Sequence, residues 1–266
     1  MADKVTSIHA GHRERLRQRL RTAGLGAFSE HEVLELLLTY AIPRQDVNPL
    51  AHELLAAFGS LSAVLNADES ELLRVKGMGG NAALLLTMMP QLMQRYQLSA
   101  LGERPVIMTL ADARAYCAPL FIGAIEEQIY MVCLDQAGHV LHRTLLHTGT
   151  VDQVPLYPRT VVETALRHNA HAVILAHNHP SGMAEASQAD VDVTKRIGTA
   201  LHMIGIKLAD HLVFAGGRAF SIMRGCTVEN EAQALCYVRN IAADSAGALR
   251  EEQYEWIAFV PQTQER

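Results

Sequence analysis

The sequence predicts an all-helical domain followed by an α/β domain, and three observations indicate this order. Apolar residues recur at helical spacing over residues 11–100. The segment LSALGERPV, residues 98–106, then contains the linker residues Gly102 and Pro105. Beyond it, short β-rich runs alternate with helical stretches, as in α/β domains. We therefore predict a helical domain at residues 1–100, an α/β domain at 104–226 and a C-terminal extension of unknown role at 227–266.

Leucines mark the buried faces of the helices expected in the first domain. Their helical spacing is clearest in two clusters: Leu34, Leu37 and Leu38, and Leu50, Leu54 and Leu55. Helix-breaking residues separate the segments: Pro43, Pro49, Gly59 and Asn66.

The second domain shows strands and helices in alternation. We expect a hairpin with its turn at Gly138, then a helix, a buried strand, a second helix and a further strand. These elements are predicted over Gln128–Leu134, Val140–His147, Val161–Asn169, Ala172–Ala176, Ser187–Ile204 and Leu212–Ala215. One short helix is predicted in the C-terminal extension, over Glu229–Ile241.

Composition narrows the class of protein. The 266 residues are 49% hydrophobic, which is enough for one large core or two modest ones. A net charge of -5 with 19% charged residues excludes both a strongly basic chain and an acidic disordered one, so any nucleic-acid contact must use a local patch. We expect neither a membrane span, which needs roughly 18 apolar residues, nor a secretory signal. Free thiols and a cytoplasmic location are expected, because no C-x-x-C spacing occurs among the cysteines: Cys117, Cys133, Cys226 and Cys236.

The segment VILAHNHPSGMAEASQAD carries the chemistry. His177 and His179 follow a buried strand at a spacing of two residues, so both imidazoles point the same way if the extended conformation persists. After a turn at residues 180–182, Ser187 and Asp190 form the S-x-x-D pattern of a helix start, from which the carboxylate can reach back toward the histidines. The pattern predicts that His177, His179 and Asp190 bind one divalent metal ion.

Zinc is the metal that this donor set favours. Two imidazoles and one carboxylate suit Zn2+, and three protein ligands leave a fourth tetrahedral position for water, as in catalytic sites. Zinc lowers the pKa of its water to about 7, and a nearby carboxylate must then accept and deliver the proton. Glu127, at the start of the strand that ends at Leu134, is the candidate for this general acid/base. Its neighbour Glu126 is the alternative, since spacing alone does not distinguish the two.

These residues together resemble a known motif. A glutamate far upstream, H-x-H, seven residues, a serine, two residues and an aspartate form the JAMM motif of MPN-fold metalloproteases, here Glu127, His177, His179, Ser187 and Asp190. The stretches VPLYPRTVVETALRHNAHAVILAHNHPSG and ADHLVFAGG resemble the RadC branch of that superfamily. The helical half resembles RadC through GHRERLRQRL, EHEVLELLL, IPRQD and FGSL. The resemblance covers about residues 11–226.

The resemblance implies a fold and a role for each residue. The fold would be an α/β MPN (JAMM) domain preceded by an all-α helix-hairpin-helix domain. His177, His179 and Asp190 would be zinc ligands, Glu127 the general acid/base and Ser187 a hydrogen-bond donor to the oxyanion. Two other interpretations stay open: Glu127 as an exposed strand-end carboxylate, and Ser187 as a helix N-cap that contributes about 1 kcal/mol.

Two segments depart from the RadC pattern, and one further pair matches it. The loop after Gly182 contains Met183, Ala184, Glu185 and Ala186 in place of a Pro-rich sequence, and the tail after Cys226 runs beyond the usual end. Neither departure includes a proposed ligand. Asp210 and His211 also match the family, and we expect them to make a structural hydrogen bond.

A second motif lies in the helical half. The run LLRVKGMGGNAALLL places Gly77 and Gly79 between two helical segments, which is the helix-hairpin-helix pattern. Glycines let the backbone approach a phosphate, and amides at the next helix N-terminus can donate to the anion. Arg74 and Lys76 add positive charge nearby, which would make binding depend on salt. We expect these four residues to contact DNA, with a protein partner or a purely structural turn as the alternatives.

A basic helix near the N-terminus supports the same expectation. It contains Arg13, Arg15, Arg17, Arg19 and Arg21. Arg13, Arg17 and Arg21 share a face by their spacing of four residues, either to contact DNA or to stay solvated.

Three functions follow from these motifs. The first is a zinc-dependent hydrolase of the JAMM type that cleaves a peptide or isopeptide bond in a peptide or protein substrate, with a DNA-binding module that localises it. The second is a DNA-binding, repair-associated module with a vestigial metal site, which the intact Glu127 disfavours because a structural site needs no general base. The third is a metal-dependent nuclease, since activated water can attack phosphate as well as carbonyl carbon. The adjacent letters His-Asn-His do not make an HNH nuclease, whose residues are dispersed over a ββα unit.

Overall fold

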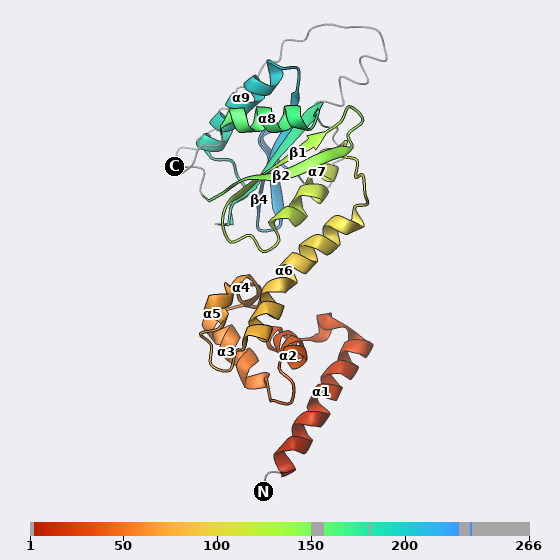
Figure 1. Ribbon diagram of the computed structural model, residues 1–266, viewed down its shortest axis with the longest axis vertical. Helices are drawn as coiled ribbons and strands as arrows, with labels where there is room; N and C mark the ends of the chain where they lie inside the picture. The colour runs from red at the N-terminus through yellow and green to blue at the C-terminus, as the bar shows by residue number, and fades with distance from the viewer. Residues whose placement is uncertain (1–2, 150–156, 181, 229–234, 236–266) are drawn as a thin grey trace. The chain divides into compact units, whose positions relative to one another are not determined.

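The chain folds into a helical unit and an α/β unit. The structure, a computed structural model, describes residues 3–149, 157–180, 182–228 and 235, with side chains from residue 11. The two compact units are Met1–Tyr96 and Gln97–Arg266. Among the described residues the first unit contains helices alone and the second mixes strands with helices, so the predicted fold class is confirmed (Figure 1). The short helix predicted over 229–241 lies outside the described residues.

The helical unit is held together by one leucine-rich core. Both predicted leucine clusters contribute to it, and Leu34, Leu38 and Leu54 are fully buried. Its elements are α1 (Asp3–Ala23), η1 (Leu25–Ala27), α2 (Glu30–Ala41), α3 (Asn48–Phe58), α4 (Leu61–Asn66), α5 (Glu69–Leu72) and the start of α6 (Gly80–Ala100). Helix α6 continues through Leu98 to Ala100, which were predicted as linker, because the first helix-breaking residue is Gly102 with φ +86°.

A six-stranded sheet with the order β2-β1-β3-β4-β5-β6 forms the α/β unit. Strands β3 and β4 pair in parallel and the other neighbours pair antiparallel. The elements are α7 (Leu110–Cys117), η2 (Ala118–Phe121), β1 (Gln128–Leu134), β2 (Val140–Thr148), α8 (Pro158–Arg167), β3 (Ala172–Asn178), α9 (Gln188–His202), β4 (Lys207–Ala215), β5 (Arg218–Ser221) and β6 (Cys226–Thr227). Helix α9 is the crossover that a parallel β3–β4 pair requires.

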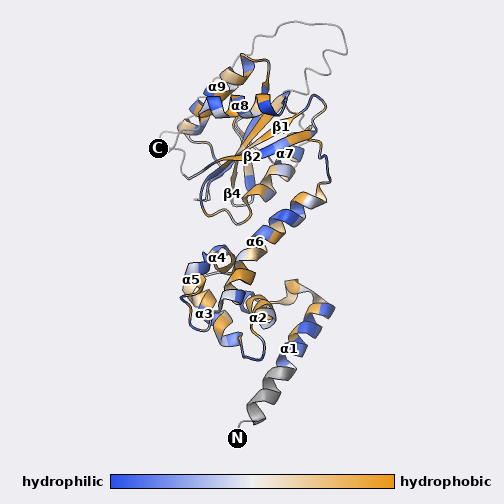
Figure 2. Cartoon of the chain, viewed as in Figure 1, coloured by the Kyte–Doolittle hydropathy of each residue, from blue (hydrophilic) through white to orange (hydrophobic). Residues whose placement is uncertain are grey.

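Helices cover both faces of this sheet. Helix α7 packs on one face, and α8 and α9 pack on the other (Figure 1). Figure 2 shows the apolar residues concentrated on the central strands, and every residue of β3 is buried. Because β3 is covered on both faces, a polar side chain at its end is surrounded by protein, where a hydrogen bond or an ion must compensate for lost water.

Several boundaries differ from the prediction for identifiable reasons. Strand β4 begins at Lys207, five residues before the predicted Leu212, because the buried polar residues Asp210 and His211 interrupt the apolar pattern. Helix α8 begins at Pro158, since proline suits the first turn of a helix, and it ends before Asn169, whose φ is +50°. Helix α7 was not predicted, although a Thr109–Asp112 capping box marks its start.

The described part of the chain contains neither a disulfide nor a helix long and apolar enough to cross a membrane. Cys117 and Cys133 are buried free thiols, and Cys226 is a partly exposed one. Burial raises the pKa of Cys117 to about 12 and that of Cys133 to about 11, so both stay protonated. Cys236 lies outside the described residues.

Candidate metal centre

The carboxyl end of β3 presents both histidines on one face. His177 is the penultimate residue of β3, which runs two residues further than predicted. The amide of His179 donates to the carbonyl of Phe214 on β4 at 2.8 Å, so the extended backbone continues to His179. Residues two apart in an extended chain point the same way. The two imidazoles therefore face one point.

Asp190 reaches the same point from the first turn of α9. Ser187 is the N-cap, and its Oγ accepts from the amide of Asp190 at 3.2 Å. In return, Asp190 Oδ2 accepts from the amide of Ser187 at 2.8 Å and from its hydroxyl at 2.7 Å. This capping box turns the carboxylate back toward β3, where Asp190 is only 2% exposed.

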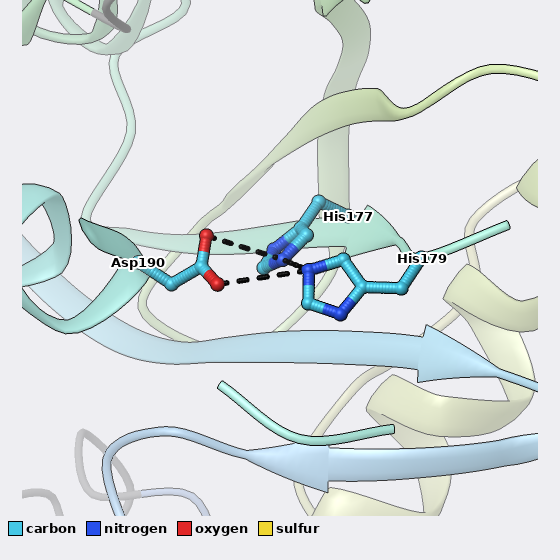
Figure 3. Close-up of side chains that lie close together, drawn as sticks. All are labelled: His177, His179 and Asp190. Carbon is cyan, nitrogen blue, oxygen red and sulfur yellow. Dashed lines mark hydrogen bonds and ion pairs between the residues drawn. The ribbon is translucent and has the colours of Figure 1, made fainter. Parts of the chain in front are cut away.

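The three side chains converge as ligands of a single ion would (Figure 3). His177 Nε2 and His179 Nε2 lie 2.9 Å apart, and they lie 3.4 and 3.6 Å from Asp190 Oδ1 and Oδ2 respectively. Ligands about 2 Å from a tetrahedral zinc ion are roughly 3.3 Å from one another, so these separations fit one ion. Among the described residues this is the one cluster of three such groups close enough to share a metal.

The second nitrogen of each imidazole indicates where its proton lies. His179 Nδ1 is 3.1 Å from the carbonyl oxygen of Met183, which can only accept, so Nδ1 carries the hydrogen and the neutral ring keeps its lone pair on Nε2. His177 Nδ1 is 2.8 Å from His211 Nε2, a partner of the kind that orients metal-binding histidines. Lone pairs of two nitrogens and a carboxylate facing one point repel unless a cation lies between them, so the residues fit a divalent metal.

Charges within the cluster are strongly coupled. Burial alone would raise the pKa of Asp190, but hydrogen bonds with His177 and His179 outweigh burial and lower the pKa. The hydrogen bond with Asp190 raises the pKa of His179 against the effect of burial, with smaller contributions from the Met183 carbonyl and from the charges of Asp190 and Glu127. Asp190 is therefore a carboxylate, the form that binds a metal.

The strand register distinguishes Glu127 from Glu126. Ile129 pairs with His177 in the β1–β3 ladder, so the two side chains share a face of the sheet. Glu127 lies two residues before Ile129, and its carbonyl accepts from Gly149 on the β2 side at 2.8 Å, which continues the extended backbone. Glu127 thus shares the face of the histidines and is half-buried, whereas Glu126 lies in the bend before the strand and is exposed.

Asn178, which the sequence analysis did not single out, ties the Glu127 segment to the metal cluster. Its Oδ1 accepts from the amide of Gln128 at 2.7 Å, and its Nδ2 donates to the carbonyl of Glu126 at 3.0 Å. The side chain is 6% exposed and bridges the residues on either side of Glu127. Its position between His177 and His179 was a signal in the sequence that could have identified Asn178 as part of the site.

Ser187, Asp210 and His211 take roles that the geometry defines. Ser187 forms the N-cap described above, so its structural role is present. Asp210 accepts from the hydroxyl of Ser221 at 2.9 and 2.8 Å and from the amide of His211 at 2.7 Å, which makes it structural. His211 instead contacts His177 and the hydroxyl of Thr194, and burial beside His177 lowers its pKa. Thr194, a second residue that the sequence analysis missed, lies one helical turn after Asp190.

The loop that departs from the RadC pattern lines a small cavity beside the cluster. The cavity has a volume of about 160 Å³, and Met183, whose carbonyl contacts His179, is one of its lining residues. Its lining residues are Met183, Ala184, Glu185, Arg218, Phe220 and Thr227. The departure therefore lies beside the cluster and includes none of its candidate ligands.

The helical hairpin forms a separate candidate site. The turn between α5 and α6 contains Gly77 with φ +91°, which requires the left-handed conformation. A Cβ built at Gly77 or Gly79 would meet no atom of the structure within 4 Å, so the backbone is open to approach. Arg74 and Lys76 are exposed on the same turn. An exposed glycine turn and two exposed positive charges thus lie close together along the chain.

The arginines of α1 are largely engaged within the unit. Arg13 donates to the carbonyls of Thr39 and Ile42 at 3.3 and 3.0 Å, and to that of Gln45, so it caps the end of α2. Arg19 pairs with Glu32 at 2.6 Å, and Arg17 and Arg21 pair with Glu14. Arg15 is exposed. Arg13 and Arg19 therefore dock the helix, whereas the pairs with Glu14 lie within α1 itself, and the docking of Arg13 weakens the expectation that α1 is a DNA-binding face.

Comparisons with known proteins divide at the same place as the structure. Residues 107–227 match the family described as RadC-like JAB domain, and residues 9–84 match the family described as UPF0758 N-terminal. A UPF0758 protein of Ruegeria pomeroyi is 41% identical over 202 residues, which are 76% of this chain and 90% of that protein. A UPF0758 protein of Rhodobacter capsulatus is 41% identical over 206 residues, 77% of this chain and 96% of that protein. The JAB match includes Glu127 and the metal cluster, and the N-terminal match includes the hairpin turn.

Proposed function

Because the chain belongs to the UPF0758 family of proteins with a RadC-like JAB domain, we propose that it is a zinc-dependent hydrolase of the JAMM type that cleaves a peptide or isopeptide bond. The observation that carries the proposal is the convergence of His177, His179 and Asp190 at the end of β3 with Glu127 on the same face. A purely structural metal site needs neither an open coordination position nor a glutamate that transfers protons.

Zinc is proposed from the chemistry of the donors. Two imidazole nitrogens and one carboxylate are typical of catalytic zinc, whereas structural zinc sites close the tetrahedron with a fourth protein ligand. When bound, the ion would polarise the carbonyl under attack and activate a water molecule at neutral pH. His177, His179 and Asp190 would hold it, and the capping box and His211 would keep these side chains in place.

Glu127 supplies the proton transfer in this proposal. Its carboxylate accepts a proton from the attacking water and delivers it to the leaving nitrogen, so that the amine departs neutral. Asn178 holds the backbone on both sides of Glu127 and thereby limits where the carboxylate can lie. Ser187 would keep accepting from the amide of Asp190 as the cap of α9, and its hydroxyl would donate to the developing oxyanion in place of Asp190 Oδ2.

The matched pair Glu127→Gln and Glu126→Gln tests this proposal. Each protein, loaded with one equivalent of zinc, is incubated with a peptide library derived from a digested bacterial proteome, and new termini are identified by mass spectrometry. We expect cleavage by the native chain and by Glu126→Gln, and a loss of at least about 100-fold in Glu127→Gln with zinc retained.

Three results would contradict it. Equal activity of the two variants would remove Glu127 from the reaction. Zinc binding without cleavage of any peptide would favour a binding module with a vestigial site. Metal-dependent cleavage of duplex DNA that is absent in Glu127→Gln would make the enzyme a nuclease.

We further propose that the hairpin contacts DNA through its phosphate backbone. The support is the open turn at Gly77 and Gly79 with Arg74 and Lys76 beside it, next to the N-terminus of α6. Backbone amides bind phosphate without reading bases, so affinity should not depend on sequence. Lys76→Ala should weaken binding to a random duplex and reduce the slope of log affinity against log salt by about one unit. An unchanged slope would favour the alternative of a protein partner.

A further inference from the structure

A buried row of hydrogen bonds runs behind the metal cluster, from α9 through β4 to β3. The hydroxyl of Thr194 lies 2.5 Å from the carbonyl oxygen of Asp190 and 2.6 Å from His211 Nδ1. His211 Nε2 lies 2.8 Å from His177 Nδ1. Exposures of these residues are 2% or less: Thr194 2%, Asp190 2%, His211 1% and His177 0%.

The position of every proton in this row follows from its first member. A carbonyl oxygen can only accept, so the single hydroxyl proton of Thr194 is donated to Asp190. The Thr194 oxygen then accepts from His211, which places the ring proton of His211 on Nδ1. A second proton on His211 would be a cation in the core, where charge is costly. His211 Nε2 is therefore an acceptor, and His177 must donate to it from Nδ1.

This order leaves the lone pair of His177 on Nε2, the atom that faces His179 Nε2 at 2.9 Å. We propose that Thr194, acting through His211, is a positioning residue that holds His177 in the tautomer able to bind the metal. The inference rests on the metal-binding half of the proposed function and does not depend on hydrolysis.

The opposite tautomer of His177 shows what the Thr194 hydroxyl prevents. With its proton on Nε2, His177 would donate to His179 across 2.9 Å and occupy the metal position with a hydrogen bond. His177 Nδ1 would then accept from His211 Nε2, so a lone pair of His211 Nδ1 would face the Thr194 oxygen at 2.6 Å. If the Thr194 hydroxyl turned to donate to that nitrogen, its oxygen would face the Asp190 carbonyl oxygen at 2.5 Å with no proton between them. That repulsion disfavours the blocked state. Without the Thr194 hydroxyl the repulsion disappears, and the blocked state becomes accessible.

A matched set of threonine variants tests this role. Thr194→Val removes the hydroxyl at constant shape, and Thr194→Ser restores it. Thr199→Val is the control, because Thr199 on the same helix also donates to a carbonyl four residues back, that of Lys195 at 2.9 Å, yet it is exposed and the described structure gives it no histidine contact. Zinc affinity is measured by competition with a chelator. The tautomers of His177 and His211 are read in the metal-free protein from imidazole nitrogen chemical shifts, assigned with a His177→Gln variant.

We expect Thr194→Val to lower zinc affinity by about 10-fold or more, as other residues that orient metal ligands do, and to move the His177 proton toward Nε2. Thr194→Ser and Thr199→Val should keep the native affinity and tautomers. Native affinity in Thr194→Val, or weaker affinity without a change of tautomer, would overturn the inference, as would a native protein with the His177 proton on Nε2. If the native chain binds no zinc, the metal proposal fails, while the tautomer measurement still tests Thr194.

Discussion

One buried carboxylate of each unit, Glu35 and Asp190, illustrates two opposite uses of a buried polar group. In the helical unit, Glu35 is 2% exposed and its carboxylate accepts from His12 Nε2 at 2.8 Å and from Asn48 Nδ2 at 2.9 Å. In the α/β unit, Asp190 is equally buried, but its carboxylate and two imidazole nitrogens face one another. Both oxygens of Glu35 accept from donors, whereas Asp190 accepts from Ser187 through Oδ2 alone and faces the imidazole nitrogens of His177 and His179.

This difference separates a structural polar group from a binding site. A buried acceptor with a protein donor contributes to stability, because its lost water is replaced within the fold. Acceptors that converge on one point with fewer donors than lone pairs destabilise the metal-free fold and are stabilised by a cation. Sites that bind should therefore gain stability on ligand addition, and structural polar clusters should only lose it on mutation.

The largest expected effect is the response of the two units to zinc. At a concentration about 1,000 times the dissociation constant, a bound ion stabilises by about 4 kcal/mol. Hydrogen exchange should show added protection in β3, β4 and α9, and none in α2 or α3. Asp190→Asn, which keeps an acceptor for the capping box, should abolish the protection. Equal protection of both units, or protection that survives in Asp190→Asn, would contradict the comparison.

Asp210 should make the α/β unit lose stability as pH rises. Burial raises the pKa of Asp210 to about 6 from 3.8, against the hydrogen bond from Ser221. The folded state thus holds a proton that the unfolded chain releases, so the stabilisation is complete below pH 4 and is lost as pH rises through 6. The difference is about 3 kcal/mol.

The free energy of unfolding of the metal-free α/β unit, measured in urea between pH 4 and 7, checks this prediction. Asp210→Asn cannot ionise, so the stability of the native chain relative to this variant should fall by about 3 kcal/mol across the window. A constant difference would show that Asp210 keeps an ordinary pKa in the fold.

Arg13 should behave as a structural residue of the helical unit. Removing its guanidinium leaves the carbonyls of Thr39 and Ile42 at the end of α2 without their donor, so Arg13→Ala should cost about 2 kcal/mol. Arg15→Ala on the same helix is the exposed control and should change stability by less than about 0.5 kcal/mol. Urea denaturation followed by hydrogen exchange in α2 distinguishes the two. If Arg13→Ala is as stable as Arg15→Ala but binds DNA more weakly, Arg13 belongs to an interface instead.

The smallest expected effect concerns Ser187. Its loss as an N-cap should cost about 1 kcal/mol in Ser187→Ala, and Ser187→Thr should recover most of it. Thermal unfolding of the metal-free α/β unit measures the stability that is lost with the cap. If the peptide cleavage rate of the zinc-loaded variant falls no more than its folded fraction, Ser187 is a cap alone. A fall of 100-fold or more would give it an additional role in the reaction.

Local sequence rules were sufficient to predict which three side chains form the cluster. Two histidines two residues apart after an apolar run predict imidazoles on one face of a strand. The S-x-x-D pattern predicts a carboxylate in the first turn of a helix. Both patterns depend on neighbouring residues alone, and the structure brings the three side chains together. Choosing between Glu126 and Glu127 required the β1–β3 register, in which Ile129 pairs with His177. That pairing joins residues 48 positions apart in the chain, so no local pattern reveals it.

Thr194, behind the cluster, was missed for the same reason, and His211 was expected to make a structural hydrogen bond without its partner being predicted. Thr194 and His211 meet because α9 packs on β4, and the polar letters Asp210 and His211 concealed the strand that carries them. Arg13 was assigned to a basic face, because the sequence alone does not distinguish an arginine that caps α2 from one that contacts DNA. Charge patterns describe the sequence of a helix, whereas tertiary packing decides which of its charges reach solvent.

The central claim is that the acceptors at the end of β3 bind one divalent cation. Metal analysis of protein purified without added zinc, then reconstituted and dialysed, measures this directly for the native chain, His177→Ala and Asp190→Ala. We predict one zinc ion per native chain and none in either variant, with both variants folded. Stoichiometric zinc that survives both substitutions, or a folded native chain that holds none after reconstitution, would contradict the account.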